Sequence, residues 1–358
     1  MKIVFITDRL AGGGLPRRML LISNILRSNG FEVYIAGKNG HLLEQIKAEN
    51  INYLLFKDYG KNPINNIFIY LVNTYKLLRY VRRNKIKTLS NHSRHTMIMA
   101  NFVRFFANAR LINVDHGIKR FNKLFRIKFL WGNNIISVSN GAKQDLVYKY
   151  KLSPDRITVI LNSIPPLDGS YKVHNLTNRK NKVVTCIAFF TEQKNHKFLL
   201  HNWEKVINHY NNVSLKLVGE GPLKEEMEKI VIDKNLNDKV EFLAGNSNVK
   251  EILSKSDFII LTSKREGLPT VILEAFSIGV PALASKIAGN NEIIENGYNG
   301  YMYEPNDSDD FVRKVKKMLD DDNNTKMMGK NAQITYQHKF SFSKYKQSII
   351  DYYSKVSK

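Results

Sequence analysis

Residues 258–274 read FIILTSKREGLPTVILE, and they carry the clearest signal of how this chain folds. Four apolar residues, Phe258 to Leu261, have the length and composition of a buried strand. A polar loop follows, and Pro269 and Thr270 then open an apolar segment that suits a helix, because a helix start tolerates the missing N–H of a proline. A strand that leads through a loop into a helix is the repeating unit of a parallel α/β sheet.

The same alternation of strand and helix runs outward through both halves of the chain. Apolar strand-length segments recur at 1–8, 31–36, 87–89, 110–114, 134–138, 182–188, 214–218 and 240–243. A polar segment without periodicity, 162–181, separates the halves. We therefore expect two doubly wound parallel-sheet domains facing across a cleft, 1–165 and 166–340, with a C-terminal helix, 341–358, that packs back on the first domain.

Length and cysteine content limit the class of protein and its compartment. The chain has 358 residues, enough for two domains, and one cysteine, which fits a reducing compartment. Cys186 lies in an apolar run and is expected to be a buried strand residue. No run approaches the ~20 apolar residues of a membrane span, and the N-terminal apolar run is too short for a signal peptide. We expect a cytoplasmic location.

The loop after the strand 258–261 is where ligand chemistry is expected. In open α/β sheets ligands bind beyond the carboxyl ends of the strands, and free N–H groups at a helix start attract phosphate. Gly267 allows a ligand to approach the backbone. Glu266 in the loop and Glu274 in the helix can address different parts of one extended ligand, and a carboxylate suits the two hydroxyls of a ribose. The alternative is a capped helix with an incidental pair of glutamates.

The surrounding residues extend this pattern along the second half of the chain. In order they are Gly219-Glu220-Gly221-Pro222, Phe242-Leu243-Ala244-Gly245, Ser256-Asp257, Glu274-Ala275-Phe276, Gly279-Val280-Pro281, Gly289, Glu292-Ile293-Ile294 and Asn299-Gly300. The series resembles the nucleotide-sugar domain of family 4 retaining glycosyltransferases with the GT-B fold, of the bacterial cell-surface polysaccharide type. The resemblance is dense over 215–305 and sparser at the glycine loop 12–14, Asp115-His116-Gly117 and Lys194-Asn195-His196.

This resemblance implies roles for the matched residues. Glu274 would bind the donor ribose, Glu266 would face the transferred sugar, Lys194 would neutralise the diphosphate, and His116 would lie beside the sugar. Glu266, His116 and Lys194 are the implied catalytic residues. The implied donor-binding residues are Gly13, Gly14, Lys194, Arg265, Gly267, Leu268, Pro269, Thr270, Val271, Glu274, Gly219 and Leu243. The nucleotide sugar, expected to be a UDP-sugar, is a substrate, so we expect no cofactor and no metal.

Two departures from the family pattern leave alternatives open. The family commonly has Gly-Arg where this chain has Ala188-Phe189, so one phosphate-binding cation is missing, and Asn162-Ser163-Ile164 replaces Asn-Gly-Ile. An inactive partner subunit is therefore one alternative, and a sugar-nucleotide epimerase of the same layout is another. A dinucleotide oxidoreductase fits poorly, because the loop 12–14 lacks the full glycine spacing and the acidic residue that follows it.

Positive charge is concentrated in the first half of the chain. Residues 1–165 hold 27 Lys and Arg against 8 Asp and Glu, a net charge of +19 out of +23. Between 75 and 131 the cations alternate with aromatic residues, a combination that suits an anionic bilayer surface. A solvated basic face is the alternative, and no nucleic-acid-binding module is recognised. We expect a peripheral protein of the inner membrane face that acts on a saccharide or lipid-linked acceptor in capsular or lipopolysaccharide synthesis.

Overall fold

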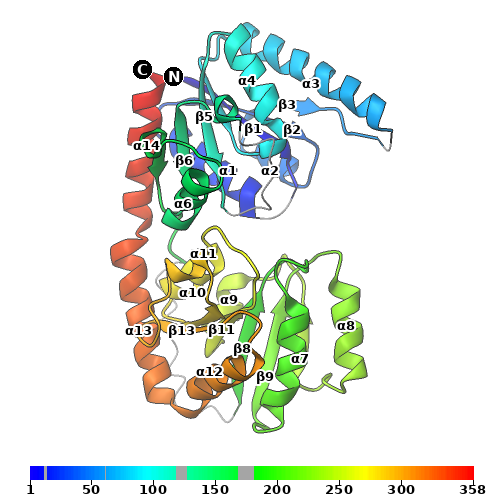
Figure 1. The fold of residues 1–358 in the computed structure, drawn as a ribbon, viewed down its shortest axis with the longest axis vertical. Coiled ribbons are helices and arrows are strands. Elements are labelled where there is room, and N and C mark those ends of the chain that lie inside the picture. The colour runs from blue at the N-terminus through cyan, green and yellow to red at the C-terminus, as the bar shows by residue number, and fades with distance from the viewer. Residues whose placement is uncertain (12–13, 61, 118–126, 168–180) are drawn as a thin grey trace. The chain divides into compact units, whose positions relative to one another are not determined.

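The computed structural model describes residues 1–11, 14–60, 62–117, 127–167 and 181–358. Within these residues the chain forms two compact units (Figure 1). The first unit is Met1–Leu161 with Ser343–Lys358, and the second is Asn162–Phe342. Each unit is built on a parallel sheet with helices packed against it, which confirms the predicted α/β class.

Seven parallel strands form the sheet of the first unit. They are β1 (Lys2–Arg9), β2 (Glu32–Lys38), β3 (Asn52–Phe56), β4 (Thr88–Asn91), β5 (Arg110–Asp115), β6 (Asn134–Ser137) and β7 (Ile157–Val159). Their order is β3-β2-β1-β4-β5-β6-β7, so the direction of winding reverses between β1 and β4. In open α/β sheets this reversal opens a crevice at the carboxyl ends of the two strands.

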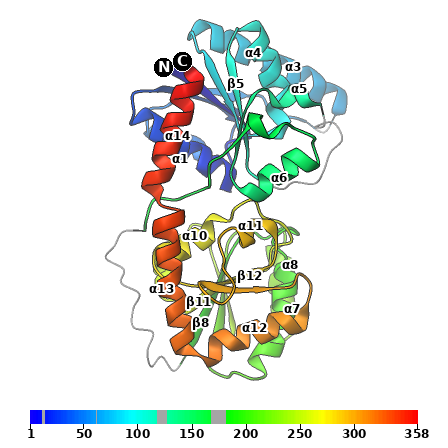
Figure 2. The same cartoon turned by 60° about the vertical axis from the view of Figure 1, so that its left-hand side comes forward.

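Helices cover both faces of this sheet. They are α1 (Gly14–Arg27), α2 (Leu42–Ala48), α3 (Pro63–Arg83), α4 (Met97–Phe106), α5 (Lys128–Trp131), α6 (Asn140–Tyr148) and α14 (Phe342–Ser357). Alternate residues of β1 point to opposite faces: Val4 and Ile6 join the apolar cluster under α3 and α4, and Phe5 stacks on Tyr353 of α14. Figure 2 shows α14 beside α1, where Tyr345 faces Arg18.

The amino-terminal half of α3 extends past the sheet (Figure 1). Its buried residues begin only at Asn73, and the earlier turns expose Ile64, Ile67 and Phe68. The carboxyl-terminal half packs through Leu77, Leu78 and Val81 on the sheet. None of the helices in the described part of the chain is long and apolar enough to cross a bilayer.

Six parallel strands form the sheet of the second unit. They are β8 (Lys182–Ile187), β9 (Val213–Val218), β10 (Val240–Leu243), β11 (Phe258–Leu261), β12 (Ala282–Ser285) and β13 (Gly300–Tyr303). The order β10-β9-β8-β11-β12-β13 places the reversal between β8 and β11. The loop predicted to bind a ligand therefore follows one of the two strands at the reversal.

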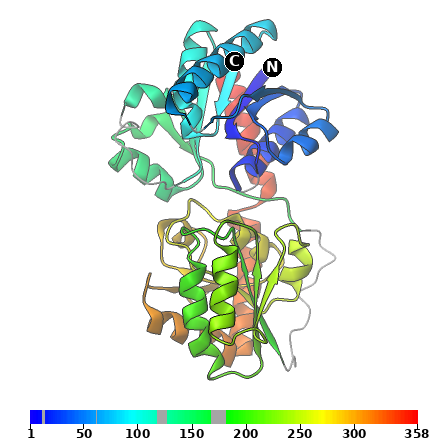
Figure 3. The same cartoon turned by 90° about the vertical axis from the view of Figure 1, so that its right-hand side faces the viewer.

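The helices of the second unit divide between the two faces of its sheet. They are α7 (His196–Ile207), α8 (Lys224–Asp233), α9 (Val249–Ser254), α10 (Thr270–Ser277), α11 (Ala288–Asn291), α12 (Ser308–Asp320) and α13 (Asp322–Lys339). Figure 3 shows α7 and α8 side by side in green. Together with α12 they bury Trp203, Met227 and Phe311 against β8, β9 and β11. The helices α10 and α13 pack on each other.

Candidate active site

The loop that follows β11 brings Glu266 onto Lys194. Lys194 lies in the loop after β8, and its Nζ is 2.5 Å from Glu266 Oε1. Ser263 Oγ donates a hydrogen bond to the same carboxylate oxygen at 2.6 Å. Glu266 is 7% exposed, so its charge is held away from bulk water and compensated by one cation and one hydroxyl. The two predicted residues meet at the carboxyl edge of the sheet, beside the strand reversal.

Hydrogen bonds between the two loops hold this arrangement in place. Lys264 N donates to Gln193 O at 2.8 Å, and Gln193 Nε2 donates to the carbonyl of Arg265 at 2.9 Å. Thr262 Oγ1 donates to Lys194 O at 3.0 Å. The backbones that carry Lys194 and Glu266 are therefore braced against each other, and the side-chain ion pair does not have to position them alone.

Close backbone packing supports the same loop from the side of α11. A Cβ on Gly289 would lie 2.6 Å from Glu266 O and 2.8 Å from Gly267 O, so any side chain at this position would move the loop. Asn290 Nδ2 donates to Ser285 O at 2.7 Å, and Ser285 Oγ donates to Ser263 O at 2.6 Å. Gly289 belongs to the family pattern, and its structural reason is this contact.

The loop ends in the first turn of α10. Pro269 is the N-cap, with φ −72° and ψ 116°, and Thr270 is the first helical residue. The N–H groups of a first helical turn have no partner within the helix, so those of Thr270 and Val271 are suited to an anionic ligand. Glu274 is half-buried one turn further along α10. Leu268 is buried, and its carbonyl receives a hydrogen bond from Asn162 Nδ2 at 3.5 Å.

Gly219 and Gly221 let the loop after β8 lie directly on the loop after β9. A Cβ on Gly219 would lie 2.1 Å from Ala188 O, and one on Gly221 would lie 2.5 Å from Phe190 O. Between these contacts Phe189 is 48% exposed, at the position where an arginine is common in the family. Leu243 ends β10 and is half-buried, and its carbonyl accepts from Gly219 N at 3.1 Å.

An apolar layer lies beneath Lys194 and changes two titratable groups. Burial raises the pKa of Cys186 to about 12, against a smaller lowering effect of the Lys194 charge. Burial, with a further contribution from Lys194, lowers the pKa of His196 to about 4. Cys186 is thus a buried thiol of β8, as predicted, and not a nucleophile at neutral pH.

The first unit has a polar cluster at the matching edge of its own sheet. Asn91 ends β4 and Asn113 lies opposite it in β5, and Asn91 Nδ2 donates to Asn113 Oδ1 at 2.8 Å. Arg94 forms a buried ion pair with Asp115 at 2.9 Å and donates to Tyr150 Oη at 2.6 Å. A small hollow beside the strand reversal is lined by Asn91, Arg94, Asn113 and Asp115, together with His92 and His116.

His116 contacts a second histidine, His92, which belongs to none of the motifs described above. His116 Nε2 is 3.0 Å from His92 Nδ1, and the two ring centroids are 5.2 Å apart. Burial lowers the pKa of His92 to about 3, so His92 is neutral at physiological pH. A histidine after a strand is usually structural, so His92 alone gave no functional signal. The available signal was that His92 and His116 each follow one of two neighbouring parallel strands, whose carboxyl ends share an edge.

The remaining predicted residues are placed as follows. Gly14 is the first residue of α1, and a Cβ there would meet no atom within 4 Å. Gly13 lies outside the described residues. Arg265 is half-buried, and its carbonyl is engaged by Gln193.

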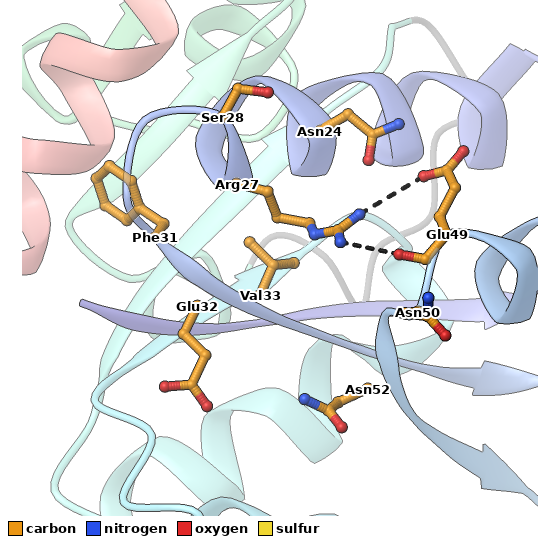
Figure 4. Close-up of a pocket in the computed structure, with 9 residues that line it drawn as sticks. All are labelled: Asn24, Arg27, Ser28, Phe31, Glu32, Val33, Glu49, Asn50 and Asn52. Atoms are coloured by element: carbon orange, nitrogen blue, oxygen red, sulfur yellow. Dashed lines mark hydrogen bonds and ion pairs between the residues drawn. The ribbon is translucent and has the colours of Figure 1, made fainter.

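A surface depression of the first unit lies at the opposite edge of the sheet (Figure 4). Glu32 and Asn52, which line it, begin β2 and β3, so it is located at the amino ends of these strands. Arg27 crosses it, donating to Glu49 O at 2.8 Å and pairing with the Glu49 carboxylate at 3.8 Å. Ligands of such sheets bind at the carboxyl ends, and the Arg27–Glu49 contacts account for this depression as a structural feature.

Two family models match consecutive parts of the chain. The model described as Glycosyltransferase Family 4 matches residues 12–166, and the model described as Glycosyl transferases group 1 matches residues 170–335. The chain is a family 4 glycosyltransferase of the GT-B type. The glycosyltransferase domain that carries Lys194, Glu266 and Glu274 is the part matched by the second model.

Relatives of this glycosyltransferase include two bacterial enzymes. The UDP-Gal:alpha-D-GlcNAc-diphosphoundecaprenol alpha-1,3-galactosyltransferase of Escherichia coli is 27% identical over 79% of this chain and 78% of its own length. The N-acetylgalactosamine-N,N'-diacetylbacillosaminyl-diphospho-undecaprenol 4-alpha-N-acetylgalactosaminyltransferase of Campylobacter jejuni is 24% identical over 87% of this chain and 88% of its own.

Solved structures share the fold of the glycosyltransferase over its whole length. A glycosyltransferase from Rickettsia africae superimposes with a TM-score of 0.85, at 20% identity, over 100% of this chain and 98% of that chain. HepE of Anabaena, solved in complex with UDP and glucose, superimposes with a TM-score of 0.85, at 19% identity, over 99% of this chain and 100% of that chain.

Proposed function

We propose that this glycosyltransferase moves a sugar from a UDP-sugar to a saccharide or lipid-linked acceptor, with retention of configuration at the transferred carbon. The names of the E. coli and C. jejuni relatives, which specify diphosphoundecaprenol acceptors, support a role in bacterial cell-envelope or capsular polysaccharide synthesis. The HepE complexes with UDP and with UDP-glucose support the nucleotide. The observation that carries the proposal is the Lys194–Glu266–Ser263 cluster beside the first turn of α10.

The proposed chemistry follows from where negative charge develops. When the sugar leaves, a nucleoside diphosphate gains charge, and preorganised donors lower the barrier to its departure. Lys194 and the N–H groups of Thr270 and Val271 would provide these donors. With Phe189 in place of an arginine, Lys194 would carry a larger share of the leaving-group charge, with Arg265 as a second candidate cation.

Glu266 and Glu274 divide the rest of the donor in this proposal. Glu274, one turn into α10, would accept hydrogen bonds from the ribose hydroxyls. Glu266 would face the transferred sugar, and its 2.5 Å contact with Lys194 gives that cation two anionic partners, the carboxylate and the diphosphate. Front-face attack by the acceptor is the proposed route to retention.

A donor screen and product analysis would test this function. We expect UDP-sugars to raise the thermal midpoint, since a ligand at 100 times its Kd adds about 2.7 kcal/mol. With the binding donor, release of free UDP would show transfer or hydrolysis, and the anomeric coupling constant of the product would show retention. Epimerised nucleotide sugar without free UDP would instead support an epimerase, and donor binding without turnover over all acceptors would support an inactive partner subunit.

We also propose that an α3–α4 face attaches the enzyme to anionic membrane. We define this face by its exposed apolar residues and the cations at its end: Ile64, Ile67, Phe68, Leu71, Tyr75, Arg79, Arg82 and Arg83 on α3, and Ile98, Phe102, Phe105 and Phe106 on α4. The α3 residues follow one stripe that is apolar first and basic toward the carboxyl end. Arg82 Nη2 donates to Phe106 O at 2.7 Å, which joins the two helices.

This combination fits a bilayer better than a solvated basic face. A face that contacts only water is not stabilised by large apolar side chains, yet Phe68 and Phe105 are 68% and 75% exposed. Insertion of the apolar residues would remove them from water, and each cation near an anionic surface adds roughly 1 kcal/mol. A lipid-linked acceptor would then be held at the same surface as the enzyme. The cations expected at 119–126 lie outside the described residues.

A further inference from the structure

A chain of buried hydrogen bonds connects α14 to His116. Tyr353 Oη is 2.6 Å from Ser90 Oγ in β4, and Ser90 Oγ is 2.9 Å from His92 Nε2. His92 Nδ1 is in turn 3.0 Å from His116 Nε2. Tyr353, Ser90 and His92 are all within 1% of full burial. We refer to these three residues as the relay.

The direction of these hydrogen bonds follows from the hydroxyl of Tyr353. A buried phenol must place its hydrogen on an acceptor, and in the described part of the chain Ser90 Oγ is the partner that Tyr353 contacts. Tyr353 is therefore the donor. The hydrogen of Ser90 is then directed to its other partner, His92 Nε2, which must be without a proton to accept it.

His92 transmits this direction to His116. Its burial lowers its pKa to about 3, so the ring is neutral and carries a single N–H. With Nε2 accepting from Ser90, that hydrogen is on Nδ1, which donates to His116 Nε2. His116 Nε2 is then an acceptor, and the hydrogen of the neutral His116 ring is on Nδ1.

We propose that the relay of Tyr353, Ser90 and His92 positions His116 and fixes its tautomer, so that His116 takes part in the transfer reaction as a hydrogen-bond donor through Nδ1 and not as a general base. The ring has two nitrogens, one already accepting from His92 and the other protonated, so neither can take a proton from an acceptor hydroxyl. An N–H donor of this kind suits a sugar hydroxyl or a phosphate oxygen. This inference rests on the proposed function only where it gives His116 a part in sugar transfer. The tautomers inferred for His92 and His116 do not depend on it.

Nitrogen NMR of the free enzyme tests the tautomers without any turnover. With ¹⁵N-labelled histidine, long-range proton–nitrogen correlations distinguish a protonated ring nitrogen from a bare one, and the variants His92→Asn and His116→Asn assign the signals. We expect bare Nε2 and protonated Nδ1 in both rings at neutral to mildly basic pH. In Tyr353→Phe no phenol donates to Ser90, so the direction of the hydrogen bonds along the relay is no longer fixed. The tautomer with its hydrogen on Nε2 should then appear in both rings. A protonated Nε2 on His116 in the unaltered enzyme, or unchanged tautomers in Tyr353→Phe, would overturn the proposal.

Steady-state kinetics of the His92 variants, with the donor and acceptor that the unaltered enzyme uses, test the positioning role. His92→Phe keeps a ring in place but removes the donor to His116, and we expect kcat to fall by about 10²-fold, the effect of misplacing a reacting group by an ångström. The KM for the nucleotide sugar should stay nearly constant, because Lys194 and Glu274, predicted to bind the diphosphate and the ribose, lie in the second unit. His92→Asn, whose amide nitrogen can occupy the place of Nδ1, should recover part of kcat.

The NMR and kinetic experiments together distinguish failure of this inference from failure of the proposed function. If the unaltered enzyme transfers sugar and His92→Phe, folded by circular dichroism, keeps its kcat, the positioning role is wrong and the glycosyltransferase function stands. If the unaltered enzyme transfers no sugar with any donor, the proposed function fails, and the tautomers measured by NMR still decide whether the relay has the inferred direction.

Discussion

At the scale of single residues, Lys194 has two tasks in the proposed reaction. It compensates the carboxylate of Glu266 at 2.5 Å, and it would also neutralise the departing diphosphate. The usual family arginine would share the second task, and Phe189 cannot. Lys194 is 22% exposed in its side chain, so its charge acts with less screening than that of a surface lysine.

We expect Lys194→Ala to lower kcat by at least about 10²-fold, roughly 2.7 kcal/mol, comparable with the loss of one oxyanion donor. The measurement is steady-state UDP release with saturating donor. Lys197→Ala is the matched control, because Lys197 lies three residues further along, in the first turn of α7, and pairs with exposed Glu226 at 3.4 Å. A loss below about fivefold for Lys194→Ala would show that other groups carry the leaving-group charge.

The two glutamates should separate binding from turnover. Glu274→Ala removes a carboxylate from the predicted ribose side, so the Kd for UDP should rise roughly 10- to 10²-fold, the range for a hydrogen bond to a charged group. Glu266→Ala should leave the Kd for UDP nearly unchanged and lower kcat. Isothermal titration with UDP and turnover assays measure the two effects. Equal and large losses of UDP binding in both variants would contradict this division.

At the scale of helices and strands, the sequence predicted where an element begins and ends better than which of its side chains are buried. Phe258–Leu261 has the predicted bounds, because four apolar residues before a polar loop have few other solutions. In α3, Ile67 and Leu78 are eleven residues apart and lie on the same side of the helix, yet Leu78 is buried and Ile67 is 65% exposed. What decides is where the sheet ends beneath the helix, and that depends on strand pairing distant in sequence.

The candidate site shows the same division between local and distant signals. Glu266, Gly267 and Pro269 lie in one loop, so a local motif was enough to select them. The contacts His92–His116 and Ser90–Tyr353 join residues 24 and 263 positions apart. Only the order of the strands and the packing of α14 bring these side chains together, and neither can be predicted from a short sequence motif.

Vesicle sedimentation tests whether the α3–α4 face binds anionic membrane. We expect the enzyme to sediment with phosphatidylglycerol vesicles, and the triple change Ile67, Phe68 and Leu71 to Ser to reduce the bound fraction, since α3 would then insert less apolar surface. Replacing Arg79, Arg82, Arg83 and Lys85 by Gln should reduce it further and remove its dependence on salt, because the Debye length falls from about 10 Å at 0.1 M to about 3 Å at 1 M.

Two controls belong to the vesicle experiment. Changing Ile232 and Met327, which are exposed in the second unit, to Ser removes apolar surface elsewhere and should leave sedimentation unchanged. Donor hydrolysis in solution should survive in all variants, because none of these residues belongs to the predicted donor site. Unchanged sedimentation after both sets of substitutions would exclude the α3–α4 face as the attachment site and would favour a soluble acidic acceptor for the positive charge.

At the scale of the whole molecule, two buried histidines couple stability to pH. Burial lowers the pKa of His92 to about 3 and, with Lys194, that of His196 to about 4. His196 Nε2 is buried without a hydrogen-bonding partner in the described residues, and its ring lies 4.4 Å from that of Phe190. Both rings stay neutral in the folded protein under conditions in which an unfolded histidine is protonated.

The free energy of unfolding should therefore fall as the pH drops from about 6.5 toward 4. The unfolded state binds the extra protons in this window, so each histidine contributes up to about 1.4 kcal/mol per pH unit. Urea unfolding at pH 7.5, 6 and 5 measures the slope, and His196→Phe should reduce it relative to the unaltered protein. The exposed His209, changed to Phe, is the control. Equal slopes in His196→Phe and the unaltered protein would contradict the assignment.

The inclusion of α14 in the first unit also affects the order in which the enzyme can be made. Tyr353 covers Phe5 and completes the surroundings of Ser90, yet α14 leaves the ribosome about 180 residues after β7. At about 5–20 residues per second, the nascent first unit waits roughly 10 to 40 s for this helix. During that interval one face of β1 and β4 lacks its cover, so translation speed and chaperone capture of the unfinished chain should influence the yield of active enzyme.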